Sequence, residues 1–274
     1  MSLRRGRYDP PPMHETKPRI FLVARPAVDL DGIRGYLEEV GGASWLERQL
    51  EESGGDPNSA ELLVEFCGRA CYRSWEPGLN VNVTRVRTDR REYLENILRS
   101  AHGSVLEHAN FSFALRDVSR VLTHELVRHR AGSAFSQESL RYVRLTDIGF
   151  RVPDVLEPVR ERVLEIVEQL EDFQREAAEK LGLDEDGVPF HVKKEATSAL
   201  RRLAPLGLST DIIWTANLRT LRHVIEMRTA EGAEEELRLV FDEIARIAQR
   251  EAPLLLQDFS RRDDGSWVPT YRKV

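Results

Sequence analysis

The spacing of hydrophobic positions predicts both strands and helices along this chain. Residues 109–118 alternate aromatic and aliphatic side chains with polar ones, which is the period of a strand with one covered face. Residues 19–28 form a short apolar run rich in strand-forming residues, and residues 209–217 are predicted to be a strand or the approach to one. Residues 60–72 repeat apolar side chains every three or four positions, so they are predicted to form a helix with one buried face.

Further segments show helical periodicity and are separated by glycine, proline or polar residues. No internal repeat or low-complexity linker interrupts them, which favours one compact α+β domain over residues 18–274. Residues 1–17 are basic and rich in proline and lack an apolar stretch, so we expect a disordered or loosely docked tail rather than a secretory signal. The further predicted helices span residues 29–39, 91–102, 119–130, 155–182, 192–203, 217–230 and 233–251.

The charge balance and the cysteines narrow the class of protein. The chain carries 40 basic and 46 acidic side chains, whereas a dedicated nucleic-acid binder usually has a basic surplus. No apolar run approaches the roughly 20 residues of a membrane-spanning helix. Cys67 and Cys71 are four residues apart on a predicted helix, where a disulfide would be strained, so reduced thiols are the simpler interpretation. We therefore expect a cytoplasmic protein that needs neither nucleic acid nor membrane.

The densest polar cluster, residues 124–144, offers groups that suit a phosphorylated ligand. Glu125, Arg128 and His129 are predicted to share one helix face, while Arg130 points elsewhere. Arginine forks and hydroxyls at a helix end can bind phosphate oxygens. A solvated, salt-bridged helix end remains the alternative interpretation of such a charge run. The other polar members of the cluster are Ser136, Gln137, Ser139, Arg141 and Arg144.

The histidines of this cluster do not have the spacing of a metal site. His124 and His129 are five residues apart, about 140° around a helix, whereas zinc ligands on one helix are spaced by four. The sequence also lacks an H-E-x-x-H motif, paired C-x-x-C motifs, a phosphate-binding P-loop and a dinucleotide-binding G-x-G-x-x-G. We therefore predict no metal site.

A second cluster, residues 217–228, contains an arginine on the apolar side of a predicted helix. Asn217 and Arg228 are 11 residues apart, so they lie about 20° from each other around the axis, on the stripe of apolar residues. A guanidinium there must be paired with an acid or face an anionic ligand, and both possibilities remain open. Arg219 and His223, four residues apart, share a different face.

Five sequence blocks connect these clusters to a known family. They are GRACYRS (68–74), HGSVLEHANFSF (102–113), RHR followed by FSQESLRY (128–142), ALRRLAP (199–205) and NLRTLRHVIEMR (217–228). Together they resemble the flavin-dependent thymidylate synthases (ThyX), whose signature is RHR followed by a conserved Ser. Five blocks in the family's order, over about residues 60–235, form a specific match.

The resemblance implies a fold, an assembly and a reaction. The family has an α+β fold with an antiparallel sheet flanked by helices, and it forms homotetramers with active sites between subunits. Its enzymes transfer a methylene group from methylenetetrahydrofolate to dUMP and complete the methyl group of dTMP with a hydride from reduced FAD, which NADPH regenerates. The family uses no cysteine nucleophile, in agreement with two cysteines on a predicted core helix.

The resemblance also implies roles for individual residues. Arg228 is expected to be catalytic, because a fixed cation at the pyrimidine stabilises the negative charge that develops there. The expected FAD-binding residues are Ser104, Arg128, His129, Arg130, Gln137, Asn217, Arg219 and His223. The expected dUMP-binding residues are Glu125, Arg128, Gln137, Ser139, Arg141, Arg201 and Arg228.

Two departures from the family pattern support alternative functions. Eight residues separate Arg130 from Ser139, one more than in the family, and Gly232 stands where a histidine is common. A ThyX-like flavin- or nucleotide-binding protein with altered or lost methylation activity is therefore the first alternative. A structural or nucleic-acid-associated protein that uses its arginine patches electrostatically is the second, and it predicts no bound chromophore.

Overall fold

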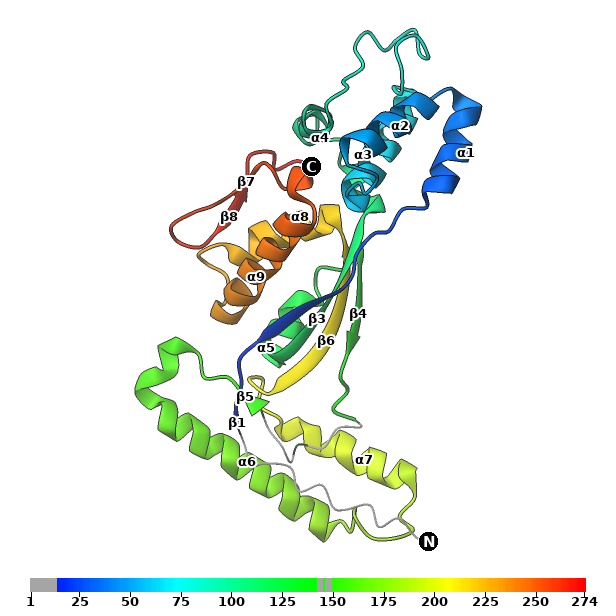
Figure 1. The fold of residues 1–274 in the computed structure, drawn as a ribbon. Helices are drawn as coiled ribbons and strands as arrows, with labels where there is room; N and C mark the ends of the chain where they lie inside the picture. Colours follow the sequence, from blue (N-terminus) through cyan, green and yellow to red (C-terminus); the bar gives the residue numbers. More distant parts are fainter. Residues whose placement is uncertain (1–13, 142–144, 146–148) are drawn as a thin grey trace. The chain divides into compact units, whose positions relative to one another are not determined.

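The computed structural model describes residues 14–141, 145 and 149–274, which form the helices and strands of an α+β fold (Figure 1). The α-helices are α1 Leu30–Val40, α2 Ala43–Glu52, α3 Ser59–Tyr72, α4 Arg90–Arg99, α5 Arg120–Leu126, α6 Arg160–Lys180, α7 Phe190–Leu200, α8 Leu218–Thr229 and α9 Glu235–Glu251. The strands are β1 His14–Glu15, β2 Arg19–Ala24, β3 Asn110–Ser119, β4 Ser133–Gln137, β5 Gly149–Phe150, β6 Ser209–Asn217, β7 Phe259–Arg261 and β8 Trp267–Pro269. Short 3₁₀ helices span Gly103–His108, Asp154–Val159, Arg201–Leu203 and Pro253–Leu255.

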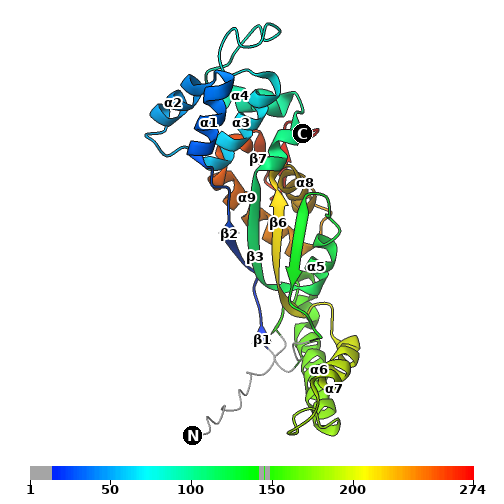
Figure 2. The same cartoon turned by 90° about the vertical axis from the view of Figure 1, so that its right-hand side faces the viewer.

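Four strands form the main sheet in the order β2-β3-β6-β4 (Figure 2). Ser112 of β3 lies opposite Thr215 of β6, with their hydroxyl oxygens 2.7 Å apart. Further along the same two strands, the backbone N–H of Asp117 donates to the Oδ1 of Asp211 at 3.1 Å. The two central strands therefore run antiparallel, and β4 pairs with β6 in the same sense. Two further pairs complete the sheets, with β1 and β5 parallel and β7 and β8 antiparallel. The predicted antiparallel sheet flanked by helices is confirmed.

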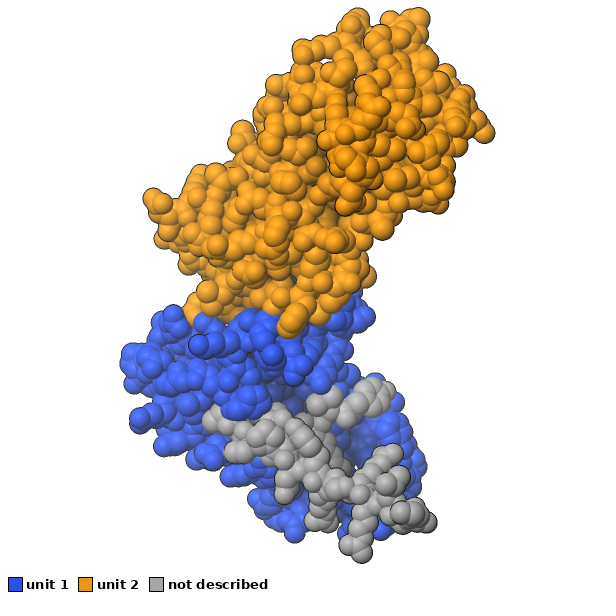
Figure 3. Space-filling view, in the orientation of Figure 1, with its two compact units in different colours: residues 1–19, 115–128, 135–213 blue, residues 20–114, 129–134, 214–274 orange. Residues whose placement is uncertain are grey.

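The contacts between residues divide the chain into two compact units (Figure 3). Unit 1 consists of residues up to 19 with 115–128 and 135–213, and unit 2 consists of residues 20–114, 129–134 and 214–274. Strands β3 and β6 each contribute residues to both units. Residues 1–13 lie outside the described part of the chain, so the tail at residues 1–17 and the single domain over residues 18–274 stay predictions.

The core of unit 2 is built on the alternation that the sequence shows in β3. Phe111 and Phe113 are both buried, and the ring of Phe113 stacks on Trp214 of β6 at 6.0 Å. Trp214 in turn meets Phe241 of α9 edge-on at 5.5 Å, while its Nε1 donates to Ser133 of β4 at 3.1 Å. Alternate residues of two neighbouring strands thus bury one face of the sheet under α9.

A second hydrophobic cluster of unit 2 lies among its first three helices. Leu37 of α1, Trp45 of α2 and Leu62 of α3 are completely or almost completely buried against one another and Trp75. Gly41 ends α1 with φ of +81°, the left-handed conformation that favours glycine. The predicted stop of this helix at the glycine pair is confirmed.

Unit 1 has its own small core beneath α6. Val167 of α6 packs with Phe150, Val152 and Leu208. The helix was predicted over residues 155–182, and the structure begins it with a 3₁₀ turn before Arg160, since a proline is tolerated only in the first turn of a helix. Within the described residues, no helix is both long enough and apolar enough to cross a membrane.

The prediction for residues 119–130 is wrong at its C-terminal end. Helix α5 stops at Leu126, and turns and irregular backbone occupy residues 127–132 before β4 begins at Ser133. Gly132 adopts φ of +66°, which is incompatible with continued right-handed helix. The expectation that Glu125, Arg128 and His129 share a helix face is therefore wrong for Arg128 and His129, which both lie beyond the last residue of α5.

Candidate active site

The structure gathers the predicted site residues into two groups, one within each unit. The group in unit 1 comprises Glu125, Arg128, Gln137, Ser139, Arg141 and Arg201. The group in unit 2 comprises Ser104, His129, Arg130, Asn217, Arg219, His223 and Arg228. Arg144 of the polar cluster lies outside the residues that the structure describes.

Helix α8 organises the group in unit 2 through its first turn. The side chain of Asn217 caps the helix by accepting from the backbone N–H of Thr220 at 2.9 Å. The Thr220 hydroxyl donates to the carbonyl of Ala131 at 2.8 Å, and the backbone N–H of Asn217 donates to the carbonyl of Gly132 at 2.9 Å. These bonds hold the segment that follows Arg-His-Arg, and they give Asn217 a structural role beside the expected cofactor contact.

Gly132 is the residue that allows this close approach. A β-carbon on Gly132 would lie 2.3 Å from the Asn217 Nδ2 atom and 2.5 Å from the Thr220 Oγ1 atom, well inside van der Waals contact. The positive φ of the residue adds a backbone penalty for any L-amino acid with a side chain. The position of the Arg-His-Arg segment therefore depends on glycine at this point.

We expect Gly132→Ala to lower the free energy of unfolding by about 1–3 kcal/mol and to weaken FAD binding, because the loop must shift away from α8. Chemical denaturation and flavin titration of the same samples measure both effects. Gly232→Ala is the control, since Gly232 has open space around its Cα and no positive φ. Equal unfolding free energies and equal FAD affinities in the two variants would show that the close contact at Gly132 does not fix the loop.

Arg228 of α8 forms a hydrogen bond with His129 of the Arg-His-Arg segment. The Nε of Arg228 donates to the Nε2 of His129 at 2.8 Å, and the His129 ring contacts the ring of His223 edge-on at a centroid distance of 6.2 Å. Three predicted site residues are thus in one chain of contacts. His129 comes from the loop after α5, and the other two come from α8.

The prediction that Arg228 lies on the apolar, inward side of its helix needs correction. Arg228 is only half-buried, whereas the fully buried arginine of α8 is Arg222, with 4% of its side chain exposed. Arg222 forms a two-pronged ion pair with Asp258 at 2.8 and 2.9 Å. Arg222 can be buried on α8 because Asp258, the residue before β7, supplies a carboxylate there, and sequence spacing does not reveal that partner.

Ser104 and Arg219 lie together in unit 2. A β-carbon on Gly103, the neighbour of Ser104, would be 2.8 Å from the Nε of Arg219. Arg219 also forms an ion pair with Glu107 at 2.7 Å, in which both side chains are nearly half-exposed. Ser104 is exposed as well, so this hydroxyl and the guanidinium are accessible to a ligand.

Unit 1 contains a polar cavity of about 420 Å³. Gln137 is held by its Nε2, which donates to the Thr123 hydroxyl at 2.9 Å. The Ser139 hydroxyl oxygen accepts from the backbone N–H of Arg141 at 3.3 Å. Three of the predicted dUMP-binding residues, Gln137, Ser139 and Arg201, line this cavity. Its lining residues are Arg120, Gln137, Glu138, Ser139, Leu140, Arg201 and Arg202.

Arg120 is a feature of this cavity that the sequence interpretation missed. Its Nη2 donates to the carbonyl of Glu138 at 2.9 Å, while its buried Nε has no hydrogen-bond partner among the described residues. Burial lowers the pKa of Arg120, and the nearby Arg201 acts in the same direction. A cation in the first turn of a helix opposes the helix dipole, and this placement is the sequence signal that could have identified it.

A second cavity of about 580 Å³ adjoins the first, because Arg201 and Arg202 line both. Arg141 and Lys194 add two more cations to it, and Glu195 is its acid. This part of unit 1 therefore combines guanidinium and ammonium groups well in excess of carboxylates. Such a surplus suits ligands with several phosphate or carboxylate groups.

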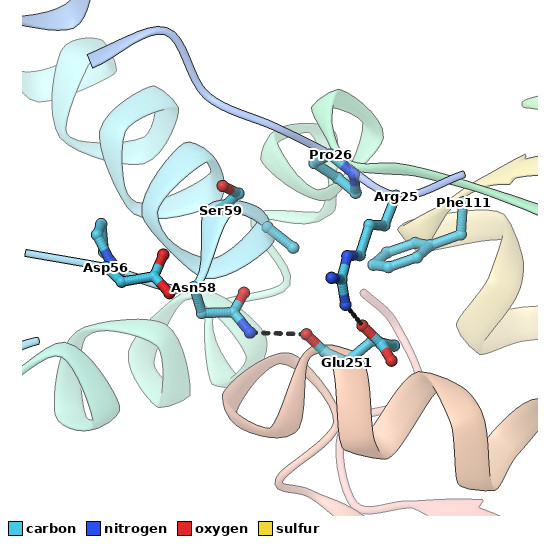
Figure 4. A pocket seen from close by; sticks show the side chains of 9 residues that line it. Arg25, Pro26, Asp56, Asn58, Ser59, Phe111 and Glu251 are labelled. Carbon is cyan, nitrogen blue, oxygen red and sulfur yellow. Dashed lines mark hydrogen bonds and ion pairs between the residues drawn. The ribbon is translucent and has the colours of Figure 1, made fainter. Parts of the chain in front are cut away.

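A cavity of about 340 Å³ in unit 2 has a different character (Figure 4). Arg25 and Glu251 form an ion pair at 2.5 Å within it, and the Asn58 side-chain amide donates to the backbone carbonyl of Glu251 at 2.7 Å. None of the predicted site residues lines this cavity. Its one cation, Arg25, stands beside two carboxylates, Asp56 and Glu251, so it does not suit a phosphorylated ligand and is not the candidate site.

The cysteines and histidines do not form a reactive or metal-binding centre in the described residues. Cys67 and Cys71 are free, and burial raises the pKa of Cys67 to about 11, which keeps this thiol protonated and weakly nucleophilic. The described ranges contain no group of three or more His, Cys, Asp or Glu side chains that could hold a metal ion.

Comparison with known proteins places these features in a family. Residues 56–254 match the sequence profile described as thymidylate synthase complementing protein. The flavin-dependent thymidylate synthase of Corynebacterium glutamicum is 36% identical over 225 residues, which cover 78% of this chain and 86% of that protein. Those of Mycobacterium marinum and Mycobacterium tuberculosis are 37% and 36% identical over 222 residues, with the same coverage.

The matched region contains every predicted site residue, from Ser104 to Arg228. It spans well over half of the chain, and the relatives are aligned over most of their own length. The chain therefore belongs to the thymidylate synthase complementing protein family, the family of the flavin-dependent thymidylate synthases.

Proposed function

We propose that the protein is a flavin-dependent thymidylate synthase that converts dUMP to dTMP with methylenetetrahydrofolate as the carbon donor. The observation that carries the proposal is the family match over residues 56–254, which includes the Arg-His-Arg segment together with Arg228. The half-buried Arg228 supplies a fixed positive charge for the pyrimidine. NADPH is the proposed reductant.

The residues present fit FAD as the cofactor. A flavin dinucleotide carries two phosphates and several ring acceptors, and the chain offers it exposed guanidinium and hydroxyl donors from Ser104, Arg130 and Arg219. When bound, FAD supplies the hydride that completes the methyl group. The protein's part is to bind and orient the ring. We propose that Ser104, Arg128, His129, Arg130, Gln137, Asn217, Arg219 and His223 do so.

The cavity around Arg120 fits the phosphate of dUMP. Its unpartnered buried Nε and the neighbouring Arg201 offer donors to phosphate oxygens, and Ser139 offers a hydroxyl. The amide of Gln137 is restrained by Thr123, which limits the orientations it can present to a ligand. We propose that dUMP is bound by Glu125, Arg128, Gln137, Ser139, Arg141, Arg201 and Arg228, with Arg120 as an additional phosphate ligand.

We expect Arg120→Gln to raise the dissociation constant for dUMP about 10- to 100-fold, because a hydrogen bond to a charged group is lost. Calorimetric titration with dUMP measures the change. Arg116→Gln is the control, since Arg116 is 57% exposed and lies near Asp117 and Asp211, outside the cavity. An unchanged affinity in Arg120→Gln would contradict the phosphate role.

We further propose a cytoplasmic homotetramer with active sites between subunits, in which residues 18–274 form the catalytic domain. Support comes from exposed apolar side chains on α6 and the 3₁₀ turn before it. Ile166 and Phe173 of α6 are 45% and 43% exposed, and Val159, seven residues before Ile166, is 51% exposed. Such a stripe is costly to leave in water and suits a subunit interface. Light scattering coupled to size-exclusion chromatography measures the mass.

Flavin spectroscopy followed by turnover tests the function directly. The purified protein is expected to show the absorbance of bound flavin, and after anaerobic reduction the addition of dUMP and methylenetetrahydrofolate is expected to reoxidise the flavin and yield dTMP. Flavin without dTMP would favour the alternative, a ThyX-like binding protein with altered or lost methylation activity. The eight-residue spacing between Arg130 and Ser139 is the observation that supports this alternative. No flavin even with added FAD would refute the proposal.

A further inference from the structure

The hydrogen bond between Arg228 and His129 has a defined direction. A guanidinium Nε can only donate, so the Nε2 of His129 must accept at the observed 2.8 Å. His129 is therefore the neutral tautomer whose proton is on Nδ1. The imidazole acts here as an acceptor for the guanidinium, a role separate from any contact between His129 and the cofactor.

The acceptor is held by the same helix that carries Arg228. The loop containing His129 is bound to the first turn of α8 through Thr220 and Asn217, as described above. The ring of His223, one turn further along, contacts the His129 ring at an interplanar angle of 72°. Helix α8 thereby fixes both the position of the His129 imidazole and the backbone position from which the Arg228 side chain extends.

The long side chain of Arg228 needs a hydrogen-bond acceptor to hold its guanidinium in one orientation. Arginine has about 2 kcal/mol of rotamer entropy, so an unrestrained guanidinium samples many orientations. A hydrogen bond at Nε restrains the plane of the guanidinium, since Nε is the atom through which the plane joins the side chain. The two Nη groups then point in a limited set of directions, and charge stabilisation benefits from such preorganisation.

We propose that His129 is a positioning residue for Arg228, holding its guanidinium in the orientation that stabilises charge on the substrate. This inference rests on the proposed function and adds to it the reason why a histidine stands between the two arginines of Arg-His-Arg. The role requires an acceptor at the position of Nε2 and no other property of imidazole. A residue of similar reach with an acceptor at its end should replace it.

The test compares His129→Leu with His129→Gln at saturating FAD and dUMP. Leucine removes the acceptor, and we expect kcat to fall about 10- to 100-fold, as for a misplaced catalytic group. The side-chain oxygen of glutamine reaches about as far as Nε2 and accepts, so kcat is expected to stay within about threefold of wild type. Because His129 is also a proposed FAD contact, the affinity for FAD, measured by flavin fluorescence, is expected to fall in both variants, and saturating FAD keeps that loss out of kcat.

Three outcomes overturn the proposal: equal kcat loss in both variants, no loss in either, or a loss confined to FAD affinity. Where His129→Leu does not fold, as judged by thermal unfolding, His129→Ala takes its place. His124→Leu controls for loss of a histidine, since His124 is exposed on α5 and outside the site. A wild-type protein that forms no dTMP would instead refute the proposed function, so the two failures are distinguishable.

A double-mutant cycle with Arg228→Lys tests whether His129 acts through Arg228. Lysine keeps a positive charge but has a methylene group where arginine has Nε, so the acceptor loses its partner. We expect His129→Leu to reduce kcat by less than about twofold further in the Arg228→Lys background, because coupled residues are not additive. Fully multiplicative losses would show that His129 acts independently of Arg228.

Discussion

Replacing Arg69 with alanine is expected to lower the free energy of unfolding by about 3–5 kcal/mol, the usual effect of removing one partner of a buried ion pair. Arg69 of α3 and its partner Glu65 both have completely buried side chains, and their closest charged atoms are 2.8 Å apart. The two Nη atoms of Arg69 donate to the backbone carbonyls of Ser74 and Arg87 at 2.7 and 2.6 Å. One guanidinium therefore joins a helix to two loop segments.

Aromatic rings enclose this guanidinium and raise the cost of losing it. The central carbon of Arg69 lies 4.3 Å from the centroid of the Tyr93 ring and 5.7 Å from that of Trp45, distances at which a cation is attracted to an aromatic face. Glu65 also pairs with Arg90 at 2.9 Å, which would remain in the variant. Alanine at this position would leave a cavity. The carbonyls of Ser74 and Arg87 would lose their donor, and the Glu65 carboxylate would keep only Arg90 as a positively charged partner among the described residues.

Denaturant unfolding of wild type and variant at equal protein and FAD concentrations measures this difference. Arg85→Ala is the control, since Arg85 pairs with Glu92 at 2.6 Å but the two side chains are 67% and 43% exposed. An exposed pair is worth about 0–1 kcal/mol, so this variant should unfold almost as wild type does. A similar, small change in both variants would show that Arg69 is not a structural link. Arg69 belongs to the GRACYRS block, which contributed to the family resemblance without a role.

Elements with a clean hydrophobic period could be predicted from the sequence. The alternation of residues 109–118 became β3, whose Phe111 and Phe113 are buried, and residues 209–217 became β6 with matching bounds. Helix α3 likewise follows the spacing of residues 60–72. In each of these segments one face is covered by the core, so the buried positions are apolar and their spacing reveals the type of element.

Elements fixed by contacts with distant residues could not be predicted. Strand β4 has Phe135 among four small or polar side chains and no fully buried position, and backbone hydrogen bonds beside it join it to β6. Helix α2 buries Gln49, which accepts from Arg90, so a polar residue interrupts its apolar stripe. The loop at Ala131 is held by the hydroxyl of Thr220 of α8, 89 residues away in the sequence.

The candidate site divides in the same way. Residue types in the two arginine clusters indicated a phosphorylated ligand, and Gln137, Ser139 and Arg201 do line one cavity. Helical spacing alone assigned burial to the wrong arginine of α8, since it cannot reveal that Asp258 pairs with Arg222. These cases depend on partners from other elements, and only the folded chain brings such partners together.

Arg228→Ala is expected to reduce the rate of dTMP formation about 100- to 1000-fold or more while FAD remains bound, as for loss of a preorganised group that stabilises a developing charge. Uracil becomes nucleophilic at C5 only as negative charge builds up on the ring, and a guanidinium held in place stabilises that charge more in the transition state than in the bound substrate. The loss should therefore appear mainly in kcat.

Flavin absorbance, dUMP affinity and single-turnover dTMP formation, measured on one preparation, separate this role from others. Arg246→Ala is the control, because Arg246 is 51% exposed on α9 and pairs with Asp242. Arg228→Lys should recover part of the rate, since it restores the charge without the hydrogen bond to His129. If Arg228→Ala lost FAD together with activity, the residue would be a cofactor ligand. If it kept the wild-type rate, the charge on the pyrimidine would have to be stabilised by another group, and the cations nearest the proposed phosphate site, Arg120 and Arg201, would be the next to test.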